Sequence, residues 1–295
     1  NGPVEHGNAP ALKARELVKF VAPTLCLWMS PPVMSLIDTS VVGRFCGSLE
    51  LASLGPGCTL IDSTGYLFTF LATATTKLVA TAQTNGDSAD HIVSEALCLA
   101  AVFGAALGAV VLLAGEPLLG IIAGKASRGV VPLALKYASI RAWGQPAVIL
   151  ATVARASSLA VKDTVGPLRS VALAFLWNAI GTVVLVRGFR LGVIWAGLAT
   201  VTADIAACVL LLSRIRRRRA APTRKARLIS VPGKENLKKF ATYAGPVFFT
   251  ILGKSVVYNG ISLCVGRLGA KALAAHEVLL RSFFFWTPVG DSIGM

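Results

Sequence analysis

The sequence predicts an all-α protein that crosses a membrane several times. Two observations predict this: the hydrophobic composition of the chain and its long runs of uncharged residues. Of 295 residues, 55% are hydrophobic and 15% are charged, with a mean hydropathy of +0.69. A soluble domain needs more charge to cover its surface, so this excess of apolar surface must face lipid. Residues 96–115 and 170–186 carry no charge, and about 20 apolar residues suffice for one helical crossing. The runs are too long and unbroken for barrel strands.

Eight spans are expected along the chain, with boundaries good to about three residues. Pro31-Pro32 should bend or break the first span, because each proline removes a backbone donor, and Glu116-Pro117 should end the third. The spans are placed at 17–42, 50–83, 89–115, 130–160, 166–187, 191–213, 236–266 and 270–295.

An arginine-rich segment and a polar, Pro-containing stretch separate two groups of spans. Arg214 and Arg216 to Arg219 close the sixth span, and a basic segment follows. This organisation predicts an N-terminal tail (1–16), a first lobe of six spans (17–219), a linker (220–235) and the beginning of a second lobe (236–295).

Membrane topology explains the excess of basic over acidic residues in the chain. The net charge is +15 with 29 Lys and Arg, and these residues are concentrated in the N-terminal tail and in the loops after even-numbered spans. Positive loops remain on the cytosol-equivalent side, so the tail and the linker should face that side. No nucleic-acid partner is expected; binding of RNA or anionic lipid by the arginine run is the alternative interpretation.

An internal repeat relates the first span to the seventh. Pro23, Val42-Gly43-Arg44 and Leu51-Ala52 recur as Pro246, Val265-Gly266-Arg267 and Leu273-Ala274, at an offset of about 223 residues. An even number of spans separates the copies, so they point the same way, as in transporters built from parallel repeats of six helices. The second copy reaches only its second helix by Met295, so we expect the sequence to be incomplete.

Four segments give the chain a family resemblance. These are Met34 to Gly43, Leu49 to Gly57, Ala156-Ser157-Ser158-Leu159-Ala160-Val161-Lys162-Asp163 to Leu168, and Ala244-Gly245-Pro246-Val247-Phe248 to Glu277. Together they resemble the multidrug and toxic compound extrusion (MATE) transporters, specifically the plant and algal plastid-type branch. That branch includes a salicylate exporter of the chloroplast envelope.

The resemblance implies two six-helix lobes that form a V and rock between inward-open and outward-open states. Proton or sodium binding to acidic groups would drive a secondary antiporter for efflux of xenobiotics and other small organic molecules. It further implies a monomer in the lipid bilayer of the plastid envelope, with no cofactor and no metal beyond the coupling ion.

Asp38 is the main candidate for cation coupling. A carboxylate within a membrane span is costly and therefore tends to be functional, and in the resembled family the matching acid binds the coupling cation. An acid facing a water-filled vestibule is the alternative. Asp62 is a second intramembrane acid that either shares the proton, pairs with Lys77 or has a structural hydrogen-bonding role. Many relatives have an acid four residues after the position of Asn178, where this chain has Thr182, so these two residues are expected to be hydrogen-bond partners.

Four residues are predicted to line a substrate cavity. Lys254 has no acid one turn away on its own span, and a cationic cavity would favour organic anions; a pair with a carboxylate of the other lobe is the alternative. Tyr258 lies one turn after Lys254. Glu277 and Arg281 are four residues apart, which also fits a self-neutralising pair on one helix face.

Other classes of function receive less support. Motifs of ATP-driven pumps and membrane enzymes, such as a P-loop or HExxH, are absent from the sequence, so no enzymatic activity is expected. A flippase for lipid-linked precursors of the same wider superfamily, or a non-functional truncated transporter, are the alternatives.

Overall fold

A computed structural model describes residues 14–123, 125–189, 192–219 and 228–266, together with Leu279, Phe283, Trp286 and Thr287. For residues 14–24, 28, 125–127, 219, 259, 262, 263, 265 and 266 it describes the backbone alone. The helices are α1 (Ala14–Phe45), α2 (Ser48–Leu67), α3 (Thr69–Thr84), α4 (Asp90–Ala123), α5 (Val131–Ala160), α6 (Val165–Thr182), α7 (Val193–Arg219) and α8 (Lys234–Gly266). A 3₁₀ turn, η1 (Lys125–Val130), and a π-helical segment, η2 (Val183–Gly188), complete the described elements.

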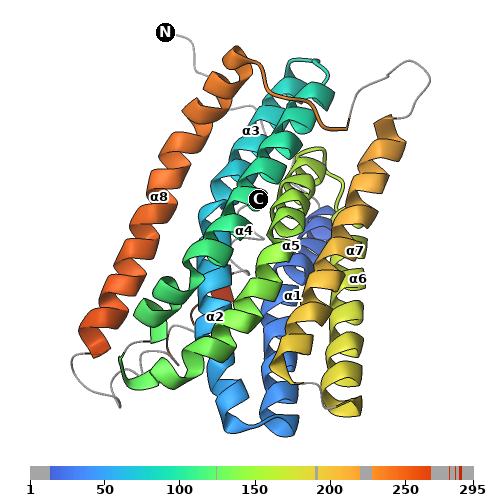
Figure 1. Cartoon of the computed structure of the whole chain (residues 1–295). Helices are drawn as coiled ribbons and strands as arrows, with labels where there is room; N and C mark the ends of the chain where they lie inside the picture. Colours follow the sequence, from blue (N-terminus) through green and yellow to red (C-terminus); the bar gives the residue numbers. More distant parts are fainter. Residues whose placement is uncertain are drawn as a thin grey trace.

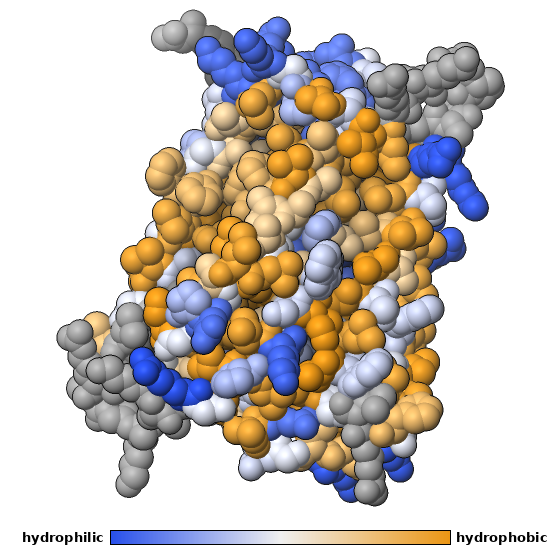
Figure 2. Space-filling model, in the orientation of Figure 1, coloured by the Kyte–Doolittle hydropathy of each residue, from blue (hydrophilic) through white to orange (hydrophobic). Residues whose placement is uncertain are grey.

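The helices run roughly side by side as a bundle, with α8 at one edge (Figure 1). Helix α5 packs most extensively against α4 and α7, and α6 packs on α7 and α1. Hydrophilic residues gather at the two ends of the bundle, and a broad hydrophobic band covers the helices between them (Figure 2). Five described segments are long and apolar enough to cross a membrane, in α1, α4, α6–η2, α7 and α8. The expected all-α, multi-pass architecture is confirmed.

Two glycines allow α4 and α5 to approach closely. A Cβ on Gly104 would lie 2.5 Å from the Cα of Pro146, and one on Gly108 would lie 2.7 Å from the carbonyl oxygen of Ala142. Membrane helices associate largely through packing of this kind, with small residues four apart at the contact. The Gly104–Gly108 pair therefore fixes the position of α5, which carries the charged residues described below.

Helix α8 is anchored on the first lobe near its own N-terminal end. Phe240 and Ala244 are buried in the same apolar cluster as residues of α3 and α4, and Phe248 contacts Phe70 with ring centroids 5.5 Å apart. The side-chain amide of Asn236 donates a 2.9 Å hydrogen bond to Oε1 of the buried Glu95. The beginning of the predicted second lobe is thus attached to α3 and α4.

At the opposite end of the bundle, Glu50 joins α2 to the beginning of α7. Its Oε2 accepts a 2.7 Å hydrogen bond from the backbone N–H of Val193. The preceding Gly192 has φ +81°, and a Cβ there would lie 2.8 Å from the same oxygen. Burial raises the pKa of the neighbouring Cys46 thiol to about 11, and Glu50 acts in the same direction, so that thiol stays protonated at neutral pH.

The structure corrects two expectations about helix ends and narrows a third. The second span is divided into α2 and α3 at Phe68, whose N–H donates to the Gly65 carbonyl at 3.0 Å, three residues back instead of four. Helix α4 continues past Pro117 to Ala123, because Leu119 after the proline is fully buried and Leu118 packs against the same apolar cluster. Of the two outcomes expected at Pro31-Pro32, a bend or a break, the break does not occur, since α1 is continuous through both prolines.

Candidate functional site

Asp38 lies at the contact between α1 and α6, where two buried polar side chains hold it. The Asn178 amide donates to both carboxylate oxygens, at 3.0 Å to Oδ1 and 3.2 Å to Oδ2. The Thr182 hydroxyl donates to Oδ1 at 2.9 Å. Asn178 and Thr182 are both 0% exposed and lie one turn apart on α6, so one helix face presents two donors to one carboxylate. The structure therefore brings together three of the four residues predicted for cation coupling.

The chemistry of this Asp38 cluster suits a monovalent cation. The hydrogen bonds that Asp38 accepts at 3.0–3.2 Å from Asn178 and at 2.9 Å from Thr182 come from neutral side chains, as does a further interaction with the Thr200 hydroxyl, and Arg141 is the cation that acts on this carboxylate electrostatically. A carboxylate within a bilayer is costly when it is charged. Neutralisation by a bound proton or cation would remove that cost, and it would also weaken the hydrogen bonds between α1 and α6.

Asp62 lies apart from this cluster and contacts an arginine. Its Oδ1 is 3.9 Å from the guanidinium of Arg141 on α5. The Asp62 side chain is 67% exposed, whereas that of Arg141 is 14% exposed. Among the described residues, the ion-pair partner of Asp62 is Arg141, and Lys77 is an exposed residue of α3. The alternative prediction, that Asp62 pairs with Lys77, is therefore wrong.

A polar seam follows the contact between α2 and α5. The guanidinium of Arg141 donates to the Tyr137 hydroxyl at 3.3 Å, and that hydroxyl lies 3.4 Å from Cys58 Sγ. Cys58 and Asp62 are one turn apart on α2, as are Tyr137 and Arg141 on α5, so the two pairs face each other in register. Arg141 is thereby held at the centre of the first lobe.

The described interior contains two further charged residues that sequence reasoning did not assign. Asp204 of α7 interacts electrostatically with both Arg141 and Arg155 of α5. The packing register explains this: Gly197 lies against Tyr137 and Gly144 lies against Val201, so Asp204 falls between the levels of the two arginines. The signal was visible, because Asp204 is the one charged residue of an otherwise apolar run, but its partners depend on tertiary packing.

A second ion cluster joins the α5–α6 turn to the end of α7. The buried Asp163 carboxylate lies 2.8 Å from Arg218 and 3.4 Å from Arg214, and it accepts the Gly166 N–H at 3.2 Å. Lys162 precedes it with φ +59°. Two residues of the arginine run therefore have a structural partner, in addition to the topological role that was expected.

The predicted substrate-cavity residues are only partly described. Lys254 is an exposed residue of α8, and no ion pair joins it to a described side chain. The Tyr258 ring packs near that of Phe283, with centroids 6.4 Å apart. Glu277 and Arg281 lie outside the described residues, so their predicted pairing stays a prediction.

Comparison with known proteins supports the transporter architecture. The MatE family matches residues 25–184. The chain is 32% identical over 271 residues to Protein DETOXIFICATION 47, chloroplastic, of Arabidopsis thaliana, covering 91% of this chain and 49% of that protein. It is 24% identical over 258 residues to DNA damage-inducible protein F of Escherichia coli (strain K12), covering 86% of this chain and 55% of that protein.

The fold also matches solved structures. A mutant of the Vibrio cholerae MATE transporter VcmN superimposes with a TM-score of 0.83 at 18% identity, covering 95% of this chain and 63% of that one. The chain spans about half the length of the curated relatives it matches.

Proposed function

Because the chain belongs to the MatE family, we propose that the protein is a secondary active transporter that exports small organic molecules, with Asp38 as its cation-coupling group. The observation that carries this proposal is the Asp38 cluster. Asn178 and Thr182 direct three hydrogen bonds to one carboxylate inside the predicted membrane region. Such an intramembrane acid tends to mark an ion pathway or a proton relay.

The cluster supports a physical route from cation binding to a change in packing. The ionised Asp38 accepts hydrogen bonds across the α1–α6 contact. When a proton binds, the carboxyl group loses its charge, and charge-assisted hydrogen bonds are about twice as strong as neutral ones. The hold of α6 on α1 therefore weakens, and an alternative arrangement of the two helices becomes accessible. In our proposal the difference in α1–α6 hydrogen-bond strength between charged and protonated Asp38 shifts the equilibrium between the two positions of the rocking lobes.

We propose a proton as the coupling ion and sodium as the alternative. Protonation needs only the carboxylate, whereas a sodium ion would also need neutral oxygen ligands, for which Asn178 Oδ1 and Thr182 Oγ1 are available. These two atoms lie 3.5 Å apart. Rates measured with an imposed proton gradient and with an imposed sodium gradient separate the two ions.

The proposed substrate class is small organic anions, and the proposed membrane is the plastid envelope. Lys254 supports the first point, since it is an exposed cation on a helix that otherwise has the composition of a membrane span. The second rests on relatives whose names describe them as chloroplastic.

The test is gradient-driven efflux by the full-length protein in proteoliposomes. Wild type is compared with Asp38→Asn, with benzoate and tetraethylammonium as test solutes under an imposed pH gradient. Proton-driven export of benzoate that is lost in Asp38→Asn supports the proposal. Equal export by both proteins would remove Asp38 from the mechanism, and preference for tetraethylammonium would reverse the predicted substrate charge.

A further inference from the structure

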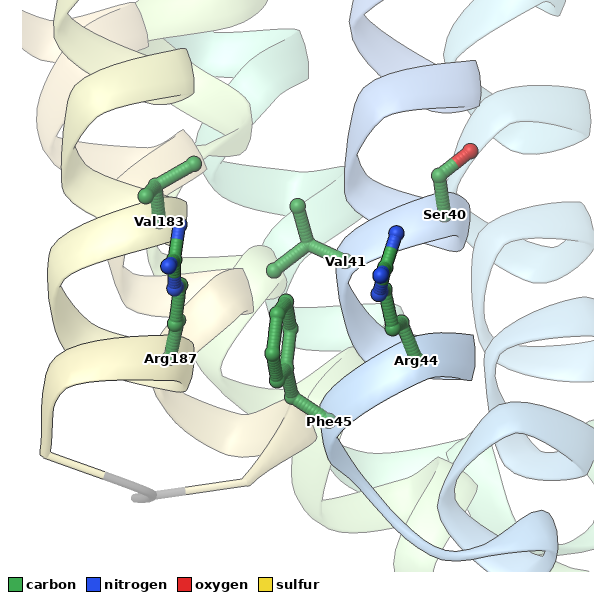
Figure 3. A pocket seen from close by; sticks show the side chains of 6 residues that line it. All are labelled: Ser40, Val41, Arg44, Phe45, Val183 and Arg187. Carbon is green, nitrogen blue, oxygen red and sulfur yellow. The ribbon is translucent and has the colours of Figure 1, made fainter.

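A cavity of about 470 Å³ opens at the end of α1 beside η2, separate from the predicted substrate-cavity residues. Its lining comes from Ser40, Val41, Arg44 and Phe45 of α1 and from Val183 and Arg187 of η2 (Figure 3). This volume lies within the range of small-molecule sites, about 300–1,000 Å³. Three of the lining side chains are apolar, and the charged ones are both arginines.

The two arginines share the cavity without an acidic partner among its lining residues. Within the described parts of the chain, Arg44 makes no ion pair, and the Arg187 guanidinium lies over the Phe45 ring, with its Cζ atom 5.6 Å from the ring centroid. A guanidinium has five N–H donors arranged to bind a carboxylate or phosphate through two parallel hydrogen bonds. This cavity therefore presents two cationic forks with donors available.

The two arginine side chains lie on either side of Val41 and Phe45 and extend back along their helices, away from the connections at the bottom of the view (Figure 3). Side chains on a helix normally lean toward its N-terminus in this way. Both guanidinium groups therefore lie beside the apolar residues that line the cavity.

The π-helical segment places Arg187 in this position. The Phe189 N–H donates to the Val184 carbonyl at 3.2 Å, which is the five-residue spacing of a π-helix. This wider turn brings residues five apart close to one face, so Arg187 of η2 lies below Thr182, the last residue of α6. On α1, Phe45 lies about two turns after Asp38. Segments of π-helix are rare and are frequently found at functional sites. The cavity therefore lies between α1 and η2, directly beyond the Asp38 cluster, which joins α1 to α6.

We propose that this cavity binds an organic anion, with one carboxylate or phosphate held between Arg44 and Arg187 and an apolar body against Val41, Phe45 and Val183. The anion would neutralise the two exposed guanidinium groups and join α1 to η2 beyond the Asp38 cluster. A carboxylate solute and the headgroup of an anionic lipid share this chemistry. The site does not depend on transport activity.

Thermal unfolding of the purified full-length protein in detergent tests the site directly. Benzoate is titrated in one arm and phosphatidylglycerol in another, with benzyl alcohol and phosphatidylcholine as matched ligands that lack net charge. The variants are Arg44→Gln, Arg187→Gln and the double variant. Arg169→Gln is the control, because Arg169 is exposed at the far end of α6 and does not line the cavity.

We expect benzoate or phosphatidylglycerol to raise the Tm of the wild type in a saturable way. The matched ligand without net charge, benzyl alcohol or phosphatidylcholine, should not raise it. The apparent affinity for the stabilising anion should fall about tenfold or more in each single variant, since each removes a charge-assisted contact. Stabilisation by benzoate would identify a solute site, and stabilisation by phosphatidylglycerol alone would identify a lipid site. If the double variant does not fold, Phe45→Leu replaces it and should weaken binding by removing the ring that contacts Arg187.

The site is rejected if neither anion stabilises the wild type or if Arg169→Gln weakens binding as much as Arg44→Gln does. These results would leave the proposed transport function intact, because that function is tested through Asp38→Asn and gradient-driven export.

Discussion

The hydroxyl of Thr182 donates a 2.9 Å hydrogen bond to Oδ1 of Asp38, which lies 144 residues earlier in the chain. Asn178, one turn before Thr182, donates to both oxygens of the same carboxylate. Both hydrogen-bond partners are neutral, and Arg141 acts on Asp38 only electrostatically. In our proposal a bound proton or cation would neutralise Asp38 and change the packing of α1 on α6.

Replacing Thr182 with Val should impair coupling without abolishing folding. The change keeps a β-branched side chain but removes a hydrogen bond to a charged group, which costs about 1.5–3 kcal/mol. We expect a lower Tm and a several-fold loss of proton-driven efflux. Thr182→Ser retains the hydroxyl and should behave nearly as wild type. Equal efflux by the Val and Ser variants would show that the hydroxyl does not serve coupling.

Arg141 and Asp62 should contribute very unequally to stability. Asp62 is 67% exposed, and an ion pair with an exposed partner contributes about 1 kcal/mol at most, so Asp62→Asn should have little effect on unfolding. Arg141 also holds the Tyr137 hydroxyl and faces Asp204. Arg141→Gln removes the ion-pair partner of Asp62 and one of the two arginines that face Asp204, and should cost about 3 kcal/mol. Denaturant unfolding in detergent compares the two, and equal losses would contradict the account.

The Asp163 carboxylate should stabilise the end of α7. It is buried and contacts both Arg214 and Arg218. Arg214 and Arg218 are 30% and 47% exposed, so water can partly solvate them when the acid is removed, and the loss of hydrogen bonds to a charged group costs about 1.5–3 kcal/mol. Asp163→Asn should therefore lower Tm and accelerate proteolysis near the arginine run. Asp87→Asn, at an exposed turn residue, is the control; matching cleavage rates in the two variants would reject the cluster's role.

Gly104 should tolerate no side chain. A Cβ there would lie 2.5 Å from the Cα of Pro146, and the backbone of α5 must move to admit it. Overpacking of this kind costs about 1–3 kcal/mol or more. Gly104→Ala should reduce the yield of folded protein and its Tm. Gly120→Ala on the same helix meets nothing within 4 Å and should be neutral or slightly stabilising, as measured by size-exclusion chromatography and thermal unfolding.

The helical class and most span positions follow from hydropathy, because an uncharged run of about 20 residues has few other structural solutions. The grouping of Asp38 with Asn178 and Thr182 was also expected, from the family resemblance and from one-turn spacing. Helix ends were less predictable. Leu119 is buried by contacts from other helices, so α4 continues beyond Pro117 despite the local signal at the proline.

Charged partners were the least predictable feature. Asp62 pairs with Arg141, and Asp204 lies between Arg141 and Arg155, because α5 contacts α2 on one side and α7 on another. This register is set by close contacts such as Gly144 with Val201. Hydropathy and motif spacing contain no information about it. The cavity at Arg44 and Arg187 likewise depends on the π-helical turn, which has no clear signature in the sequence.

The most direct test of the central claim is a count of protons bound by the purified full-length protein. An indicator dye in weakly buffered detergent solution measures proton uptake as the pH is lowered, for wild type and for Asp38→Asn. The account predicts that the variant takes up about one proton fewer per molecule, because the carboxamide cannot be protonated in this range. Equal uptake by the two proteins would show that Asp38 does not bind the coupling proton.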